Sequence, residues 1–200
     1  MALRRAQKPS SDRILESAEK VFAEHGYAEV SLRQLMSAAG VSTTAFYARF
    51  DSKEAVMAAL VTRLFSDLYA AAPSVLDRAR DLDTGIDVGV DLLCDMFGPR
   101  KALVRMILSE AGSAPAAVDA RRRAYSVLAT FLSARVRSMS ERSRRRAPFA
   151  DDPDAFAWAL VGALEIQVVR WAVWDEIDLA TLRTQLRSTA RAIFPHKETP

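Results

Sequence analysis

The chain has 200 residues, half of them apolar, and its 28 basic and 25 acidic side chains give a formal net charge of +3. This length allows one or two small domains with a sizeable core. A single cysteine excludes a disulfide framework and a thiolate metal cluster and suits a reducing cytoplasm. The few glycines and prolines, with abundant Ala, Leu and Arg, are typical of an all-α protein.

The N-terminal segment, residues 1–10, is basic and carries no apolar run, so it does not resemble a secretory signal. We expect a disordered arm that either touches DNA or remains a solvated tail. A helix is predicted near residues 11–25, because its apolar residues recur on one helical face. These residues are Ile14, Leu15, Ala18, Val21 and Phe22.

Residues 31–53 read SLRQLMSAAGVSTTAFYARFDSK and predict a helix–turn–helix. Ser31 followed by Gln34 fits a capping box at the start of the first helix. Gly40 is suited to end it, because glycine adopts the left-handed conformation without a side-chain penalty. One apolar face is predicted to pack inward, formed by Leu32, Leu35, Met36 and Ala39.

Ser42 is placed to cap the second helix, from which Phe46 and Phe50 reach back to the core. Threonine side chains facing outward can contact base edges, and a Tyr or Arg can reach phosphate or guanine. Lys53 begins the next helix, after Asp51 or Ser52 as the cap, and predicts a phosphate contact. The predicted DNA-binding residues are Ser31, Arg33, Ser42, Thr43, Thr44, Ala45, Tyr47, Arg49 and Lys53.

A helical hairpin that only packs would show the same caps and glycine turn. The motif GVSTTAFYARFDSK, preceded by LRQLMSAAG, nevertheless resembles the DNA-binding domain of the tetracycline-repressor (TetR) family over residues 11–60. The resemblance implies a transcriptional regulator, by default a repressor. Thr43, Thr44, Ala48 and Arg49 depart from residues frequent in the family, and we expect operator preference to reside there.

Charge is unevenly distributed along the chain. Residues 1–53 carry eight basic and six acidic side chains, whereas residues 121–146 carry nine arginines and one glutamate. The DNA-binding domain is therefore only mildly basic, and we expect it to bind DNA well only when two copies act together. The Arg142–Arg146 cluster is interpreted as a solvated helix end, with a second DNA site as the alternative.

Further helices are predicted near residues 53–72, 84–97, 100–111, 116–139, 153–174 and 179–194, giving about nine in all. The predicted organisation is an N-terminal three-helix helix–turn–helix domain and a C-terminal helical ligand-binding and dimerisation domain. The predicted ranges are 1–10 for the arm, 11–53 for the helix–turn–helix, 54–72 for a connecting helix, 73–195 for the regulatory and dimerisation domain and 196–200 for the tail. No apolar run approaches the roughly 20 residues needed to span a bilayer.

Small and apolar residues on the last two helices are candidates for a dimer surface or for the chain's own core. The TetR resemblance implies that these helices pack against a second copy, so that a homodimer reads a palindromic operator in double-stranded DNA. The candidate interface residues are Ala155, Ala159, Gly162, Ala163, Ile166, Leu182 and Leu186.

The middle of the chain is rich in aromatic residues, which line an apolar ligand pocket or form ordinary core. The candidates are Phe97, Met106, Glu110, Tyr125, Phe131, Trp158, Glu165 and Trp171. By family analogy an unknown small-molecule effector would release the DNA. We predict no cofactor, metal or catalytic residue, because the sequence has no nucleophile–His–acid set, phosphate loop or metal-ligand spacing. The alternatives are a helical protein-interaction adaptor and a small enzyme without a motif.

Overall fold

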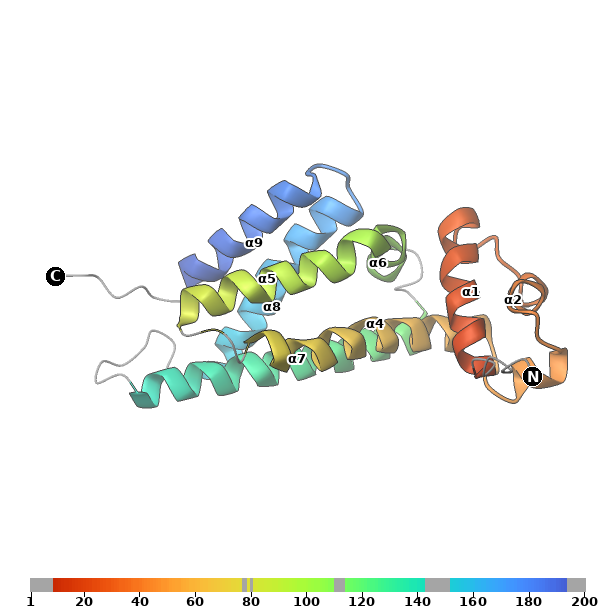
Figure 1. The fold of residues 1–200 in the computed structure, drawn as a ribbon, viewed down its shortest axis with the longest axis horizontal. Helices are drawn as coiled ribbons and strands as arrows, with labels where there is room; N and C mark the ends of the chain where they lie inside the picture. The colour runs from red at the N-terminus through yellow and green to blue at the C-terminus, as the bar shows by residue number, and fades with distance from the viewer. Residues whose placement is uncertain (1–8, 77–78, 80, 110–113, 143–151, 194–200) are drawn as a thin grey trace, which may run out of the picture. The chain divides into compact units, whose positions relative to one another are not determined.

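The computed structural model describes residues 9–76, 79, 81–109, 114–142 and 152–193. Every regular element among these residues is helical, which confirms the predicted all-α class (Figure 1). The chain forms two compact units, one from residues 1–64 and 106–121 and the other from residues 65–105 and 122–200. The boundary between residues 64 and 65 falls inside a helix. The first unit also includes residues 106–121, which the sequence analysis placed in the regulatory and dimerisation domain.

The first unit contains α1 (Ser10–His25), α2 (Leu32–Ala39), α3 (Thr43–Tyr47) and the beginning of α4 (Lys53–Leu76). The predicted inward faces of these helices meet in one core, because their apolar residues recur at helical spacing. The side chains of this core that are at most 1% exposed include Ile14, Ala18, Phe22, Leu35, Phe46, Met57 and Leu60.

Helix α4 extends past Pro73 to Leu76, so the prediction that it ends before this proline was wrong. Proline removes one backbone donor and crowds the preceding turn, which disrupts the middle of a helix. Here Pro73 is exposed and lies in the final turn, and the helix continues for only three residues after it.

The second unit contains α5 (Leu82–Phe97), the 3-10 turn η1 (Gly98–Arg100), and the greater parts of α6 (Lys101–Leu108) and α7 (Pro115–Arg142). It also contains α8 (Pro153–Ala172) and α9 (Leu179–Ile193), and α9 packs against both α5 and α8. Asp152 caps α8 as predicted, with its carboxylate accepting a hydrogen bond from the Ala155 amide at 2.9 Å. The observed helices agree with the predicted ones to within a few residues.

Helices α4 and α8 are, by length and composition alone, long and apolar enough to cross a bilayer. The most apolar window of each is 39% buried, and both helices contribute fully buried side chains, among them Leu60 on α4 and Leu160 on α8. Core helices of globular proteins meet the same criteria, so the two helices give no membrane assignment.

Candidate nucleic-acid interface

Helix α2 begins with the predicted capping box. The Ser31 backbone amide donates to Gln34 Oε1 at 2.8 Å, and the Gln34 amide donates to Ser31 Oγ at 3.3 Å. Gly40 ends the helix in the left-handed conformation, with φ of 60° and ψ of 40°. These contacts satisfy backbone groups at both helix ends, so local sequence alone determines where α2 begins and stops.

Helix α3 presents its polar residues to solvent because one aromatic residue anchors it. Ser42 caps the helix by accepting a hydrogen bond from the Ala45 amide at 3.2 Å. Phe46 is fully buried and stacks edge-on against Tyr47, with ring centroids 5.7 Å apart. Burying this one face leaves Thr43, Thr44 and 49% of Tyr47 exposed.

Seven of the nine predicted DNA-binding residues are exposed, and Ala45 and Lys53 are partly buried. The exposed set combines hydroxyl groups at the starts of α2 and α3 with guanidinium groups on α2 and after α3. Such a surface can contact both phosphate oxygens and base edges. The exposed members are Ser31, Arg33, Ser42, Thr43, Thr44, Tyr47 and Arg49.

Lys53 has partners within the protein. Its Nζ donates to the backbone oxygens of Tyr27 at 2.8 Å and Ala28 at 3.2 Å. It also lies 4.5 Å from the centroid of the Tyr27 ring. Ser52, rather than Asp51, caps α4, with its hydroxyl accepting from the Ala55 amide at 3.0 Å. The predicted phosphate contact thus competes with contacts to the turn between α1 and α2.

Tyr27 and Glu54 belong to the same cluster, and sequence analysis missed both. Burial, together with the neighbouring Glu54 charge, raises the pKa of Tyr27 to about 12. The pKa of Glu54 is lowered, chiefly by hydrogen bonding to its own backbone amide at the start of α4. The only sequence signal was an aromatic residue directly after Gly26, a pattern shared by many ordinary turns.

The described members of the predicted pocket differ widely in burial. Phe97 and Trp171 are buried, Tyr125 and Glu165 are partly buried, and Phe131 is 48% exposed. Phe97 and Tyr125 do meet around a shared neighbour, because Phe65 stacks edge-on against each, at 6.1 and 5.9 Å. Met106 lies in the first unit, and Glu110 lies outside the described residues.

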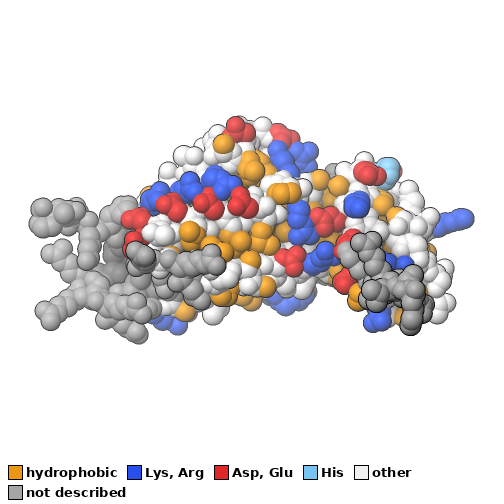
Figure 2. Space-filling model, viewed as in Figure 1, with side chains coloured by type: hydrophobic (Ala, Val, Ile, Leu, Met, Phe, Trp, Pro, Cys, Tyr) orange, Lys and Arg blue, Asp and Glu red, His pale blue; other side chains and the backbone are white. Residues whose placement is uncertain are grey.

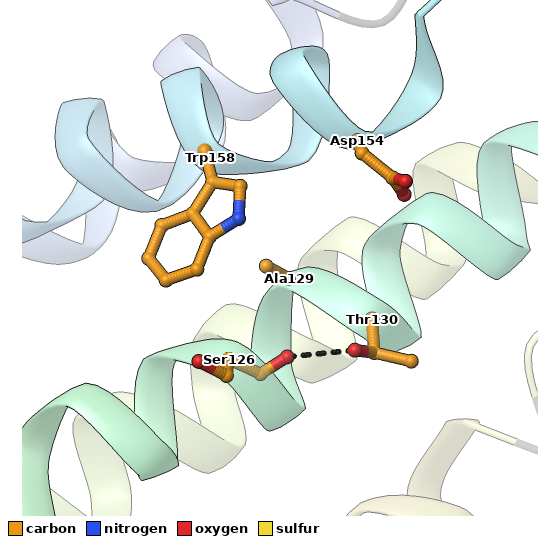
Figure 3. A pocket seen from close by; sticks show the side chains of 5 residues that line it. All are labelled: Ser126, Ala129, Thr130, Asp154 and Trp158. Atoms are coloured by element: carbon orange, nitrogen blue, oxygen red, sulfur yellow. Dashed lines mark hydrogen bonds between the residues drawn. The ribbon is translucent and has the colours of Figure 1, made fainter.

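Trp158 lines a hollow of about 220 Å³ on the surface of the second unit (Figure 3). The indole projects from α8 toward α7, beside the Asp154 carboxylate of the same helix. Asp154 is already engaged, since Arg137 Nη2 donates to it at 3.0 Å and the Ser133 hydroxyl donates at 2.5 Å. Asp154 therefore already has two partners within the chain; the other residues that line the hollow are Ser126, Ala129 and Thr130.

The candidate dimer residues divide into two groups. Ala155, Ala159, Gly162 and Ile166 are exposed on α8, and Ala163 is partly buried. Leu182 and Leu186 are 0% and 1% exposed, so they form part of the chain's own core and not a surface for a second copy. This corrects their predicted role: the apolar stripe of α9 faces inward, toward α5 and α8.

A ladder of ion pairs joins α5 to α9, which we call the α5–α9 ladder, and sequence analysis did not predict it. Aspartates at every fourth position of α5 meet arginines at every fourth position of α9 (Figure 2). Each arginine bridges two successive aspartates. The residues are Asp83, Asp87, Asp91 and Asp95 on α5 and Arg183, Arg187 and Arg191 on α9.

Two basic segments singled out in the sequence lie outside the described residues. They are the arm, residues 1–8, and the Arg142–Arg146 cluster, of which only the Arg142 backbone is described.

The fold and the exposed α2–α3 surface define the class of helix–turn–helix proteins. Residues 14–60 match the sequence model of "Bacterial regulatory proteins, tetR family".

Curated relatives carry the same class. The HTH-type transcriptional regulator EthR of Mycobacterium tuberculosis is 32% identical over 108 residues, covering 51% of this chain and 50% of that protein. UidR of Escherichia coli, also an HTH-type transcriptional regulator, is 24% identical over 135 residues, or 68% of each chain. The chain thus spans about half the length of the EthR proteins that it matches.

Solved structures share the fold over nearly the whole chain. A protein assigned to the TetR family from Syntrophomonas wolfei has a TM-score of 0.78 at 18% identity, covering 92% of this chain and 93% of that one. The fatty acid degradation regulator FadR from Bacillus halodurans has a TM-score of 0.76 at 20% identity, covering 93% and 96%. Residues 14–60 thus carry the sequence pattern of the tetR family of bacterial regulatory proteins, and the solved structures share the fold over nearly the whole chain.

Proposed function

We propose that this protein is a sequence-specific DNA-binding transcriptional regulator that acts in the cytoplasm. The observation that carries the proposal is the exposed face of α3, where Thr43, Thr44 and Tyr47 project from a helix fixed by the Ser42 cap and buried Phe46. Such side chains can contact base edges in a major groove. The relatives named above, all transcriptional regulators, support the same function.

The test is selective binding to a DNA fragment from the gene's own promoter region, measured at moderate salt against an unrelated fragment of equal length. We expect Thr44→Ala and Tyr47→Ala to reduce selectivity, because base contacts carry sequence information. Arg49→Ala should weaken binding more than Lys20→Ala, which removes an exposed charge from α1. Equal binding to both fragments by the unaltered protein would refute the function.

We further propose that the protein is a homodimer that reads a palindromic operator, because one mildly basic domain neutralises few phosphates. The outward face of α8 supports a second copy: Trp158 and Ile166 are 46% and 43% exposed, and Gly162 lies midway between them along the helix. Sedimentation at micromolar concentration should show a dimer. Ile166→Glu should give monomer, whereas Val118→Glu, at an exposed apolar site of the first unit, should not.

Repression relieved by a small-molecule effector is the third part of the proposal. The meeting of Phe97 and Tyr125 around Phe65 supports an apolar effector site in the second unit. An effector must bind the DNA-free state more tightly in order to release the operator. A compound that raises the Tm of the free protein and weakens operator binding would satisfy both conditions. Leu128→Trp, at a partly buried residue that packs like Tyr125 against Ala129, Ala157 and Val161, should weaken binding of the compound.

A further inference from the structure

The ammonium of Lys53 connects two parts of the first unit that are far apart in sequence. Its hydrogen bonds to the Tyr27 and Ala28 carbonyls span 26 and 25 residues, at 2.8 and 3.2 Å. The Tyr27 ring lies on a further side of the ammonium, 4.5 Å away. Two of its three N–H groups are therefore directed at backbone oxygens, and its side chain is partly buried.

The turn that receives these bonds is held at both of its ends. Gly26 ends α1 with a φ of 80°, and its amide still bonds to Phe22. Val30 is 1% exposed and anchors the far end, while the Tyr27 ring packs on Phe22 at a centroid distance of 5.3 Å. Between these two anchors, Lys53 donates hydrogen bonds to the carbonyls of Tyr27 and Ala28.

The two ends joined by Lys53 are the ends of the helix–turn–helix itself. Ser31, the cap of α2, follows Ala28 by three residues, and Lys53 is the first residue of α4. Helices α2 and α3 lie between these two points in the chain. Fixing both points restricts how α2 and α3 can tilt as a pair, and binding geometry on DNA depends on such preorganisation.

We infer that Lys53 is a positioning residue for DNA binding: its ammonium closes the two ends of the helix–turn–helix instead of neutralising a phosphate. This inference rests on the proposed DNA-binding function. It assigns Lys53 a different role from Arg49, whose guanidinium is exposed and whose charge is available to phosphate.

Salt dependence distinguishes the two roles. A side chain that neutralises a phosphate releases counterions, so its removal makes the negative slope of log K against log salt less steep by roughly 0.9. A positioning residue changes the affinity at every salt concentration and leaves the slope nearly unchanged. Lys53→Met removes the ammonium and keeps most of the aliphatic stem. Arg49→Met is the matched control, because it removes an exposed positive charge close by in the chain.

The experiment uses the full chain and the promoter fragment bound by the unaltered protein, with affinities measured over a range of salt concentrations. We expect Lys53→Met to weaken binding by about tenfold, because the helix–turn–helix loses its preorganisation, with the slope unchanged. Arg49→Met should make the negative slope less steep by roughly 0.9. Tyr27→Leu should also weaken binding, and the double variant with Lys53→Met should bind no worse than the weaker single variant.

Lys53→Gln provides a second variant in case Lys53→Met does not fold, and it keeps an amide donor without the charge. It should bind better than Lys53→Met, because a neutral donor can still bond a carbonyl. A slope that becomes less steep by roughly 0.9 in either Lys53 variant would overturn this inference and leave the proposed function standing. The same holds if the affinity losses of Tyr27→Leu and Lys53→Met multiply in the double variant. Absence of selective binding by the unaltered protein would overturn the proposed function as well.

Discussion

Arg187 and Asp91 form the central rung of the α5–α9 ladder, with Arg187 Nη2 donating to Asp91 Oδ1 at 2.6 Å. Asp91 also accepts from Arg183, so one carboxylate balances two guanidinium groups. Asp95, at the end of the ladder, accepts from one arginine among the described residues, Arg183, at 2.7 Å, and its side chain is 69% exposed against 39% for Asp91. The two aspartates therefore differ in both number of partners and screening by solvent.

The first prediction is that Asp91→Asn destabilises the protein more than Asp95→Asn. Removing the central carboxylate charge leaves two half-buried arginines undercompensated, at a cost of about 1–2 kcal/mol, intermediate between exposed and buried pairs. The terminal substitution should cost less than about 0.5 kcal/mol. Urea denaturation at low and high salt measures both, and the difference should shrink as salt screens the pairs. Equal losses would mean that the ladder contributes no cooperative stability.

The second prediction concerns the capping box. Ser31→Ala removes the hydroxyl that accepts from the Gln34 amide, and a lost N-cap typically costs about 1 kcal/mol. Ser37→Ala, at an exposed position within α2, removes a hydroxyl without a capping role and should change stability by no more than a few tenths of a kcal/mol. Thermal unfolding followed by circular dichroism compares the two variants. An equal effect of both would argue against the cap.

The third prediction is that Gly40→Ala destabilises the protein by about 1 kcal/mol through backbone strain. Gly40 has a φ of 60°, and a Cβ there would meet no atom within 4 Å, so a steric clash is not the cause. Gly89→Ala lies inside α5, where a Cβ would contact only Leu76 at 3.7 Å, and it should stabilise by up to about 1 kcal/mol. Opposite signs in urea denaturation confirm the conformational explanation.

The fourth prediction is that the charge of Asp175 stabilises the folded protein in a pH-dependent way. A hydrogen bond from Lys101 at 2.5 Å, followed by the charges of Arg105 and Lys101, lowers the pKa of Asp175 below its ordinary value of 3.8. A carboxyl whose folded-state pKa is lowered contributes stability that is present above pH 3.8 and is lost as the pH falls through the lower, folded value. We expect Asp175→Asn to lower the Tm near neutral pH.

Asparagine is the suitable replacement because Asp175 has a φ of 55°, which Asn tolerates as well as Asp does. The substitution therefore removes charge without adding backbone strain. The difference in Tm between the variant and the unaltered protein should shrink as the pH falls below 3.8 and disappear below the lower pKa of the folded state. A constant difference from neutral to acid pH would show that charge is not its source.

The fifth prediction is that Cys94 is chemically inert in the folded protein. Its side chain is fully buried, and burial is the main reason that the pKa of its thiol is raised. Both effects lower the concentration of accessible thiolate, which is the reactive species. A colorimetric disulfide reagent should label native protein no faster than the protein unfolds, and should label one thiol per chain at once in denaturant.

Sequence analysis succeeded where the determining interactions are local. The caps at Ser31, Ser42 and Asp152 and the left-handed Gly40 depend on residues no more than a few positions away, and the structure confirms each of them. Helical periodicity also identified the buried side of α3. Phe46, which was predicted to reach the core, is fully buried, and its neighbour Tyr47 is exposed.

Interactions between distant segments were not accessible in the same way. Apolar spacing correctly identified an apolar stripe containing Leu182 and Leu186, but spacing cannot tell whether a stripe meets the chain's own core or a second copy. The partners of Lys53 are backbone oxygens, which have no sequence signature. The ladder required knowing that α5 lies beside α9, since fourfold spacing on either helix alone is also typical of a solvated face.

Two faces of helix α9 are engaged with the rest of the second unit, and this restricts the mutations that the helix can accept. Leu182 and Leu186 face the core, while Arg183 and Arg187 engage α5 one position further along. Inserting a single residue after Ala180 would rotate these side chains by about 100° around the helix axis. The leucines and the arginines would leave their partners together, so α9 should tolerate substitutions at its exposed positions far better than any change in its length.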